Sequence, residues 1–311
     1  MVRKLNIKEP DLSVKIGKVI MKNPVMTASG TFGYGKEYSG FFDIDEIGAV
    51  VVKGINMAGS DGNKPPRIVE VTAGLVNSIG LQGPGVKKFI DEYMPFFDKY
   101  DVPVIVNIWG KDIDEYVQVA SCLMKIPRVS ALELNVSCPN VKSGGAAFGT
   151  DEKNLSKLIA KVRKVTDITL IVKLAPNVSR IADFARICES EGADAVSLIN
   201  SYPAMVIDVD RRRPVLANKI GGLSGPAIHP IAVKLVWEAA SAVKIPVIGI
   251  GGISSVKDAL EFIIAGATAV AVGTANFTDP LISLSIIAGI KDYLIRHNMP
   301  SIKSLIGSLS T

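Results

Sequence analysis

The hydrophobic residues of this chain fall into short continuous runs rather than into an alternating pattern. Eight such runs are rich in β-branched residues, and each ends in a small or polar residue. Runs that are apolar throughout their middle are typical of parallel strands buried on both faces. The eight predicted strands cover residues 23–29, 48–54, 102–110, 130–137, 169–176, 194–200, 245–252 and 268–274.

Segments with helical periodicity lie between most of these runs. In residues 151–165, leucine, isoleucine and valine share one face after an acidic first turn. In residues 179–192, Ser179 is the predicted N-cap and Gly192 the predicted C-terminal stop. The same periodicity predicts helices in residues 111–125 and 255–267.

Eight strands alternating with helices predict an α/β fold, a single (β/α)8 TIM barrel that forms one domain over residues 1–311. A doubly wound sheet is the alternative, but it usually has fewer strands and a glycine fingerprint on its first turn, which Ala28-Ser29-Gly30 does not provide. Three segments are longer than simple connections between strands and helices. Residues 1–20 predict a hairpin at the N-terminal end of the barrel, and residues 55–95 and 202–228 predict loops inserted at its C-terminal face.

Composition and charge narrow the class of protein. The chain is 48% hydrophobic and 21% charged, and its net charge of +5 is too mild for a dedicated nucleic-acid binder. No stretch has the length and apolarity of a signal peptide or a membrane span. Three cysteines without a CxxC pair indicate free thiols in a reducing compartment, and they argue against a zinc or iron–sulfur site in this chain. We therefore expect a soluble, cytoplasmic protein.

The ends of the predicted strands carry an unusual set of polar side chains. Buried amines and amides are costly unless paired, so lysines and asparagines converging on one rim indicate a functional site rather than core packing. In chain order the strand ends carry Ser29, Lys53, Asn107, Asn135, Lys173, Asn200, Gly251-Gly252 and Gly273-Thr274.

These residue types suit a planar cofactor that bears a phosphate. Barrels commonly hold a phosphate at glycines after the seventh and eighth strands, where bare backbone N–H groups can approach its oxygens. Asn107 and Asn135 offer donors and acceptors to a heteroaromatic ring, and Lys173 could stabilise negative charge developing on that ring. No carboxylate pair accompanies them, which argues against glycosidase chemistry and metal-dependent hydrolysis, so we expect no metal.

Cys138 lies in a predicted loop, which is an unusual position for a cysteine. It follows a predicted strand within Ser137-Cys138-Pro139-Asn140, at the start of a glycine-rich loop. A cysteine that only packs would be safer inside the apolar run. From its position alone, Cys138 could be either a catalytic residue or a packing residue.

Five motifs together resemble the dihydroorotate dehydrogenases, the flavin enzymes of pyrimidine synthesis. The resemblance runs from about Asn23 to Phe277, and the continuation NVKSGGAAFGTDE after SCP is similar to the NAD-linked class 1B catalytic subunits. The membrane-bound class 2 enzymes instead have serine at the cysteine position. The motifs are ELNVSCPN (133–140), NSIGLQGPG (77–85), VSLINS (196–201), GGLSGPAIHP (221–230) and IPVIGIGGI (245–253).

The resemblance implies FMN-dependent oxidation of dihydroorotate to orotate in pyrimidine (UMP) biosynthesis, with Cys138 as the general base and flavin as the hydride acceptor. The FMN shell that it implies consists of Ser29, Lys53, Gly54, Asn107, Asn135, Lys173, Ile199, Gly225, Gly251, Gly252, Gly273 and Thr274. The substrate residues that it implies are Lys53, Asn77, Ser78, Ile79, Gly80, Leu81, Asn135, Asn140, Asn200 and Ser201.

The resemblance also implies partners. Class 1B catalytic subunits form a homodimer joined into a heterotetramer by a second subunit, which carries FAD and a 2Fe–2S cluster and reduces NAD; no nucleic acid or membrane is involved. The chain departs from the family pattern at several positions. Gly83 stands where asparagine is usual, Trp109 and Lys111 alter the NxAG context, NSYPAM (200–205) replaces the commoner NTxxGM, and His229 replaces a frequent lysine.

Three alternatives stay open at this point. A dihydropyrimidine dehydrogenase-like enzyme usually reads SCPH, so Asn140 argues against it. A dihydrouridine synthase would be expected to bring an RNA-binding extension and stronger basic clustering. A non-enzymatic barrel scaffold would have no use for the lysine–asparagine rim.

Overall fold

The computed structural model describes residues 9–137 and 148–310. Eight parallel strands form one sheet in the order β3-β18-β17-β12-β11-β10-β9-β4, and all eight predicted strands are confirmed. They are β3 (Val25–Thr27), β4 (Val50–Ile55), β9 (Val104–Ile108), β10 (Val129–Asn135), β11 (Thr169–Lys173), β12 (Ala195–Leu198), β17 (Val247–Ile250) and β18 (Ala269–Val272).

The first and last strands of this order close the sheet into a barrel. Met26 forms an isolated parallel bridge with Ala49, and the Gly48 N–H donates to the Val25 carbonyl at 2.7 Å. The Thr27 hydroxyl accepts from the Val51 N–H at 2.9 Å, so a side chain takes the place of a ladder bond at the seam. The predicted (β/α)8 TIM barrel is therefore confirmed.

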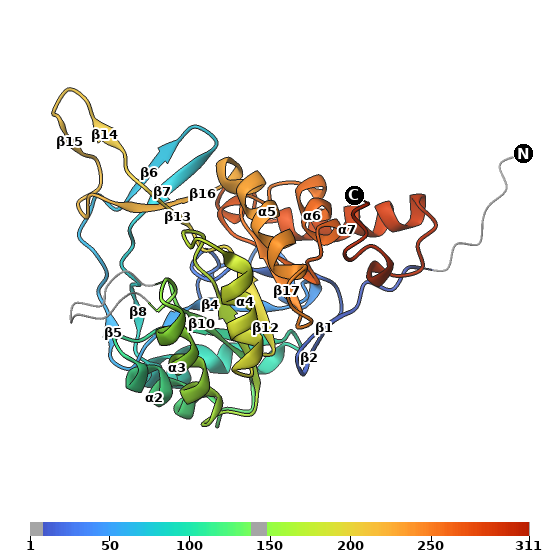
Figure 1. Ribbon diagram of the computed structural model, residues 1–311, viewed down its shortest axis with the longest axis horizontal. Coiled ribbons are helices and arrows are strands. Elements are labelled where there is room, and N and C mark those ends of the chain that lie inside the picture. The colour runs from blue at the N-terminus through green and yellow to red at the C-terminus, as the bar shows by residue number, and fades with distance from the viewer. Residues whose placement is uncertain (1–8, 138–147, 311) are drawn as a thin grey trace, which may run out of the picture.

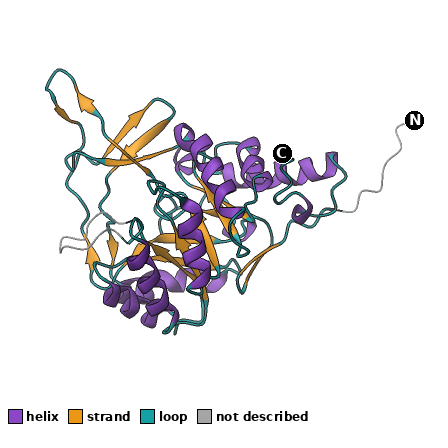
Figure 2. Ribbon diagram, viewed as in Figure 1, coloured by secondary structure: helices purple, strands orange, loops and turns teal. Residues whose placement is uncertain are grey.

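Helices surround the strands, as Figures 1 and 2 show. They are α2 (Ile113–Leu123), α3 (Glu152–Arg163), α4 (Ile181–Ser190), α5 (His229–Ala240), α6 (Val256–Ile264) and α7 (Ile282–Arg296). The single turn α1 (Val86–Lys88) continues into the π-helix η2 (Phe89–Tyr93) and the 3-10 helix η3 (Met94–Lys99). The other 3-10 turns are η1 (Ile44–Glu46), η4 (Pro226–Ile228), η5 (Thr274–Phe277) and η6 (Ile302–Ser304).

Local signals explain most helix ends. The Asp151 carboxylate caps α3 by accepting from the Asn154 N–H at 2.8 Å. The predicted stop at Gly192 is confirmed by its φ of +87°, a conformation that favours glycine. The predicted N-cap Ser179 is wrong, because α4 begins at Ile181 and its N-cap is Arg180, whose side chain makes no capping bond.

A short hairpin lies at the N-terminal end of the barrel, as the sequence predicted. It pairs β1 (Val14–Ile16) with β2 (Val19–Met21) in antiparallel fashion. The Lys18 N–H donates to the hydroxyl of Thr169, the first residue of β11, at 2.8 Å. The hairpin therefore covers the end of the barrel opposite the polar strand ends.

The two segments inserted at the C-terminal face form a sheet together, where the sequence predicted only loops. Its order is β13-β16-β7-β6, and β16 from the later segment pairs with β7 from the earlier one. Figure 1 shows this sheet projecting away from the barrel, with β14 and β15 beyond it. Its strands are β6 (Ile68–Val71), β7 (Gly74–Asn77), β13 (Tyr202–Ala204) and β16 (Gly221–Ser224); the small pairs are β14 (Ile207–Asp208) with β15 (Arg213–Pro214), and β5 (Gly59–Ser60) with β8 (Gly83–Pro84).

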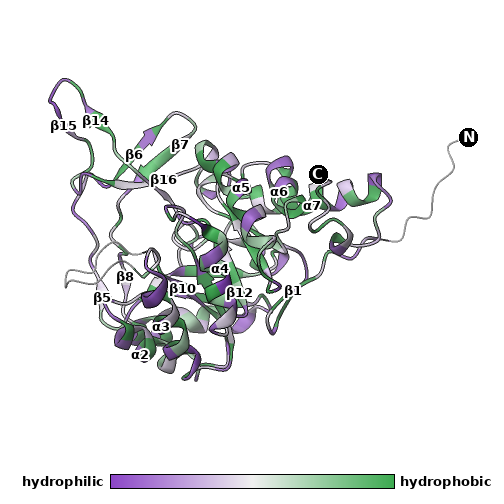
Figure 3. Cartoon of the chain, viewed as in Figure 1, coloured by the Kyte–Doolittle hydropathy of each residue, from purple (hydrophilic) through white to green (hydrophobic). Residues whose placement is uncertain are grey.

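The barrel strands and the inner faces of the helices make up the core. Every residue of β9 and of β11 is buried. The outer helices, such as α2 and α3, carry both hydrophobic and hydrophilic residues (Figure 3). Among the residues that the structure describes, no helix is long and apolar enough to cross a membrane.

Candidate active site

Three predicted site residues lie on adjacent strands at the C-terminal end of the barrel. The pairing of β9, β10 and β11 sets Asn107 beside Glu133, and Asn135 beside Lys173. Asn107, Asn135 and Lys173 are all buried. Because the strands are parallel, the same end of each one reaches the same mouth, and the predicted rim forms there.

The Lys173 ammonium reaches across this mouth. Its Nζ donates to the Ser29 hydroxyl at 3.1 Å, although β11 and β3, the strand before Ser29, are separated by three other strands. Lys173 is 4% exposed, and within the described ranges it forms no ion pair. A buried cation whose partner is a neutral hydroxyl is suited to a ligand that carries or develops negative charge.

Two of the predicted substrate residues bond to each other. Asn200 Nδ2 donates to Asn135 Oδ1 at 3.1 Å, and the Ser201 N–H donates to Asn200 Oδ1 at 2.8 Å. The Tyr116 hydroxyl of α2 donates to the Asn135 carbonyl at 2.6 Å and holds the end of β10. The two amides are therefore fixed relative to the barrel.

The projecting sheet brings residues from the two inserted segments together. Asn77 Nδ2 donates to the Gly222 carbonyl at 3.2 Å. A Cβ on Gly222 would collide with the Ser201 hydroxyl, so glycine is required for this approach. Asn77 and Ser201 thus lie on either side of Gly222, and the predicted substrate segment Ser78-Ile79-Gly80-Leu81 follows directly after β7.

Lys53 lies in a bulge of β4, where Lys53 and Gly54 together face the single residue Asn107. Burial lowers the pKa of the Lys53 ammonium, the nearby Arg67 guanidinium lowers it further, and Glu37 opposes the change. Two cations held close together favour an anionic ligand, because an anion would relieve their repulsion.

A hollow of about 350 Å³ adjoins Lys53 and includes one departure from the family pattern. Tyr34, Gly83 and Lys53 all line it. A Cβ on Gly83 would lie 2.7 Å from the Tyr34 hydroxyl, so the tyrosine occupies space that a larger residue 83 would need. The Tyr34 hydroxyl is buried without a hydrogen-bond partner among the described residues, and burial raises its pKa.

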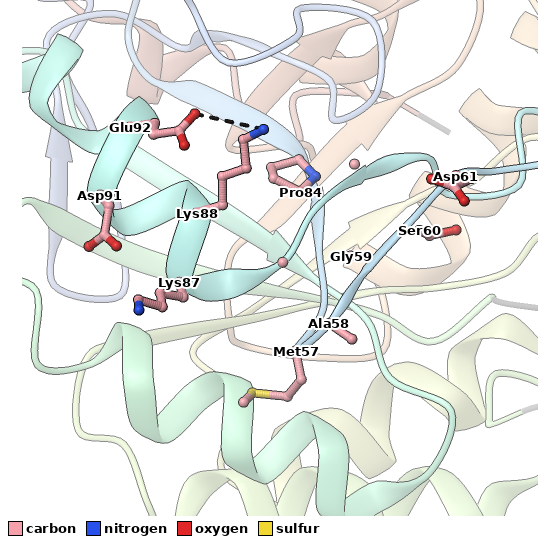
Figure 4. A pocket seen from close by; sticks show the side chains of 12 residues that line it. Met57, Ala58, Gly59, Ser60, Asp61, Pro84, Lys87, Lys88, Asp91 and Glu92 are labelled. Atoms are coloured by element: carbon pink, nitrogen blue, oxygen red, sulfur yellow. Dashed lines mark ion pairs between the residues drawn. The ribbon is translucent and has the colours of Figure 1, made fainter.

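A larger hollow of about 640 Å³ lies farther along the same segments, between β5, β8 and the start of α1 (Figure 4). It shares Ser60, Asp61, Gly83, Pro84 and Lys88 with the smaller hollow. The Lys88–Glu92 ion pair, 3.8 Å long, lies on its wall. It is lined by none of the predicted site residues, so size alone does not make it the active site.

Glycines with bare backbone gather where a phosphate was predicted. Gly225, Gly251 and Gly252 have φ of +98°, +137° and +66°. A Cβ on Gly252 would lie 2.8 Å from the Gly225 carbonyl oxygen, so the two glycines approach each other closely. Next to them, Thr274 donates its hydroxyl to Ser224 at 2.8 Å, and the predicted residue Ile199 packs near Gly251.

His229, the first residue of α5, lies behind these glycines. Its Nδ1 is 3.2 Å from the Gly251 carbonyl oxygen, and its Nε2 is 2.8 Å from Glu261 Oε2 on α6. His229 therefore connects α6 to the glycine cradle, which consists of Gly225, Gly251 and Gly252.

Sequence reasoning missed one buried residue of the site, Glu133. It is 2% exposed inside the barrel, where Asn107 Nδ2 donates to its Oε1 at 2.7 Å and the Ser197 hydroxyl donates to its Oε2 at 2.8 Å. The available signal was a charged residue in the middle of an apolar run, "LELN". Cys138 and Asn140, both predicted site residues, lie outside the described residues.

Replacing Gly252 with alanine is expected to weaken both the fold and phosphate binding. The positive φ disfavours alanine, and the new Cβ would lie 2.7 Å from His229 Cβ. We expect the free energy of unfolding to fall by about 1–3 kcal/mol. A displaced N–H at position 252 would lose one charged hydrogen bond to the phosphate of the FMN that the motifs predict, and this loss would weaken FMN binding by roughly 10–100-fold. Thermal unfolding and FMN titration measure these effects.

The control is Gly40→Ala, where a Cβ would meet nothing within 4 Å, and it should match the wild type. Equal FMN affinity in both variants would contradict a role of Gly252 in phosphate binding.

Comparison with known proteins agrees with the motifs. The family model for dihydroorotate dehydrogenase matches residues 11–294. Proteins named dihydroorotate dehydrogenase B (NAD(+)), catalytic subunit, are similar over nearly their whole length. The one from Geotalea daltonii is 52% identical over 97% of this chain and 99% of its own, and the one from Thermoanaerobacter pseudethanolicus is 54% identical over 96% and 99%. The one from Bacteroides fragilis is 50% identical over 96% and 99%. The resemblance to the class 1B catalytic subunits is therefore confirmed, and this chain belongs to the dihydroorotate dehydrogenase family.

Proposed function

We propose that this protein oxidises dihydroorotate to orotate in pyrimidine biosynthesis, with FMN bound at the C-terminal mouth of the barrel. The observation that carries the proposal is the buried Lys173, with Asn107 and Asn135 beside it, facing a mouth that also holds the glycine cradle. Cations, amides and bare backbone N–H groups are what a phosphate-bearing heteroaromatic cofactor requires.

The residues of the mouth fit FMN. Gly225, Gly251 and Gly252 must be glycine for the chain to pack here, because each has a positive φ and a Cβ on any of them would lie within 3 Å of another protein atom. Their bare backbone N–H groups would be free of side-chain cover for a phosphate. Gly273 leaves open space, since a Cβ there would meet nothing nearer than 3.5 Å. Bound FMN would supply the acceptor for the hydride of dihydroorotate. We propose that the whole chain forms one FMN-binding barrel domain. In it, Lys173 would favour negative charge on the flavin ring, as a fixed cation in a site without water does.

The substrate side of the mouth is formed by the amides and the cations. Asn135 and Asn200, fixed by their mutual hydrogen bond, would offer donors and acceptors to the pyrimidine ring. Lys53, close to Arg67, would attract the carboxylate of dihydroorotate. Cys138 follows β10 by three residues, and we propose that it removes the proton from the face of the substrate opposite the flavin.

We propose that electrons leave through a second subunit with FAD and a 2Fe–2S cluster, which reduces NAD. The relatives' names support this, since they describe catalytic subunits of NAD(+)-linked enzymes. A homodimer of this chain with two such partners, a heterotetramer, is the assembly we propose. Cys122 and Cys188 are free thiols, which suits a location in the reducing cytoplasm.

The test begins with the colour of the purified protein. We expect it to be yellow with FMN, and dihydroorotate added without oxygen should bleach the flavin and yield orotate. Dihydrouracil should not, which separates this function from a dihydropyrimidine dehydrogenase. NAD reduction should require a co-purified iron–sulfur flavoprotein, and fumarate is the comparison acceptor. An FMN-loaded protein that dihydroorotate fails to bleach would overturn the proposal.

A further inference from the structure

A buried carboxylate lies beneath the proposed cofactor site, and the reaction as described does not use it. Glu133 on β10 is enclosed in the barrel at 2% exposure. Burying a carboxylate costs several kcal/mol unless hydrogen bonds compensate. Here both oxygens accept: Oε1 from Asn107 Nδ2 at 2.7 Å and Oε2 from the Ser197 hydroxyl at 2.8 Å.

The first of these bonds decides which way the Asn107 amide faces. Both carboxylate oxygens of Glu133 act as acceptors in this arrangement, so Asn107 turns its NH2 group toward Glu133. Its Oδ1 is then directed elsewhere, and it lies next to Gly54, where a Cβ would be 3.0 Å away. Gly54 belongs to the bulge of β4 beside Lys53, which borders the mouth. The amide therefore presents an acceptor rather than a donor on that side.

A neutral amide at position 133 would not impose this orientation. Glutamine can donate as well as accept, so it could pair with either end of Asn107. Only a group restricted to accepting selects one of the two amide orientations in a buried network. This selection gives a reason for a carboxylate in the middle of an otherwise apolar strand.

We propose that Glu133 is a positioning residue that makes Asn107 present its carbonyl oxygen to the ring N–H of the bound flavin. The proposal rests on the proposed function, because it takes the flavin as the ligand. Glu133 acts through Asn107 and does not itself contact the cofactor. Through Asn107, the Glu133–Asn107 pair accepts a hydrogen bond from the one ring N–H of oxidised FMN. The site should therefore bind a flavin that lacks this hydrogen more weakly.

The test compares two ligands, FMN and 3-methyl-FMN, in which a methyl group replaces that hydrogen. Quenching of flavin fluorescence on titration of the apoprotein gives both dissociation constants. The wild type should bind 3-methyl-FMN at least about tenfold more weakly, the scale of one lost buried hydrogen bond plus an unpaired acceptor. In Glu133→Gln the amide can turn over, so FMN should bind about tenfold more weakly and the preference between the two flavins should shrink.

Two further variants separate positioning from general damage. In an Asn107→Ala background, Glu133→Gln should weaken FMN binding by less than about twofold more, because the two residues act as one unit. Ser197→Ala removes the other partner of Glu133 without touching Asn107. It should lower thermal stability and keep the preference for FMN over 3-methyl-FMN.

The possible failures are distinguishable. If wild-type apoprotein binds no FMN, the proposed function fails. If it binds FMN and 3-methyl-FMN equally, the proposal for Glu133 is overturned, and this result needs no variant to fold. Unchanged preference in Glu133→Gln, or an equal loss of preference in Ser197→Ala, would also overturn it while leaving the proposed function in place.

Discussion

Replacement of Cys138 with alanine is expected to lower turnover of dihydroorotate by about 10²–10⁴-fold at neutral pH, the usual contribution of a general base. The FMN content of the variant should stay at the wild-type level, because the residues proposed to hold FMN lie on the barrel strands and the glycine cradle. Steady-state kinetics together with the flavin absorption spectrum measure both quantities. Cys122→Ala, a change in a half-buried thiol on α2, is the control and should be fully active.

The serine variant gives a sharper test of the same role. A free thiol has a pKa of about 8.5, and an ordinary hydroxyl loses its proton only at far higher pH. The pH profile of kcat for the wild type should therefore level off near the thiol pKa, and that of Cys138→Ser should still rise at the alkaline limit of stability. If the alanine variant turned over at the wild-type rate, Cys138 would not be the base.

Replacement of Lys173 with methionine is expected to have the second large effect. The ammonium is buried and its hydrogen-bond partner, the Ser29 hydroxyl, is neutral, so its charge is available to the cofactor. Removing one such group from a catalytic site typically slows the reaction by about 10²–10³-fold. Rapid mixing with dihydroorotate without oxygen measures the rate of flavin bleaching, and the flavin midpoint potential should fall.

Stability distinguishes this role from a structural one. Methionine removes a buried amine that has no carboxylate partner in the described part of the chain, so the apoprotein should melt at the same or a higher temperature. Ser29→Ala removes the hydroxyl partner and keeps the charge, so its bleaching rate should stay within about tenfold of the wild type, a loss on the scale of one hydrogen bond. A Lys173→Met protein that melted earlier but bleached normally would make Lys173 a structural residue.

The strands and the rim could be predicted because their signals are local. A run such as residues 102–110 is apolar throughout, which separates a strand buried on both faces from an amphipathic one. Parallel strands all point the same way, so the polar residue that ends each run had to reach the same mouth. Asn107, Asn135 and Lys173 therefore converge as their positions in the chain predicted.

Other features depend on contacts that no local pattern encodes. The N-cap of α4 is one, since Ser179 has the better cap chemistry, yet the helix begins after Arg180. The sheet that joins β7 to β16 is another, because it pairs residues separated by about 145 positions, as in the Asn77–Gly222 bond. Gly83 is a third, because a side chain there would meet the Tyr34 hydroxyl and the Gly54 carbonyl oxygen, which come close to it only in the folded chain.

The sequence by itself determined the barrel, its polar mouth and the family, because periodicity, strand ends and motifs are properties of consecutive residues. Only the tertiary structure decided how the mouth is organised. Glu133 is hidden within a strand run, and its role depends on Asn107 and Ser197, which come from neighbouring strands. Hydrogen-bond direction inside a barrel depends on which side chains meet across strands. That meeting is set by register and closure and not by the order of residues along any one strand.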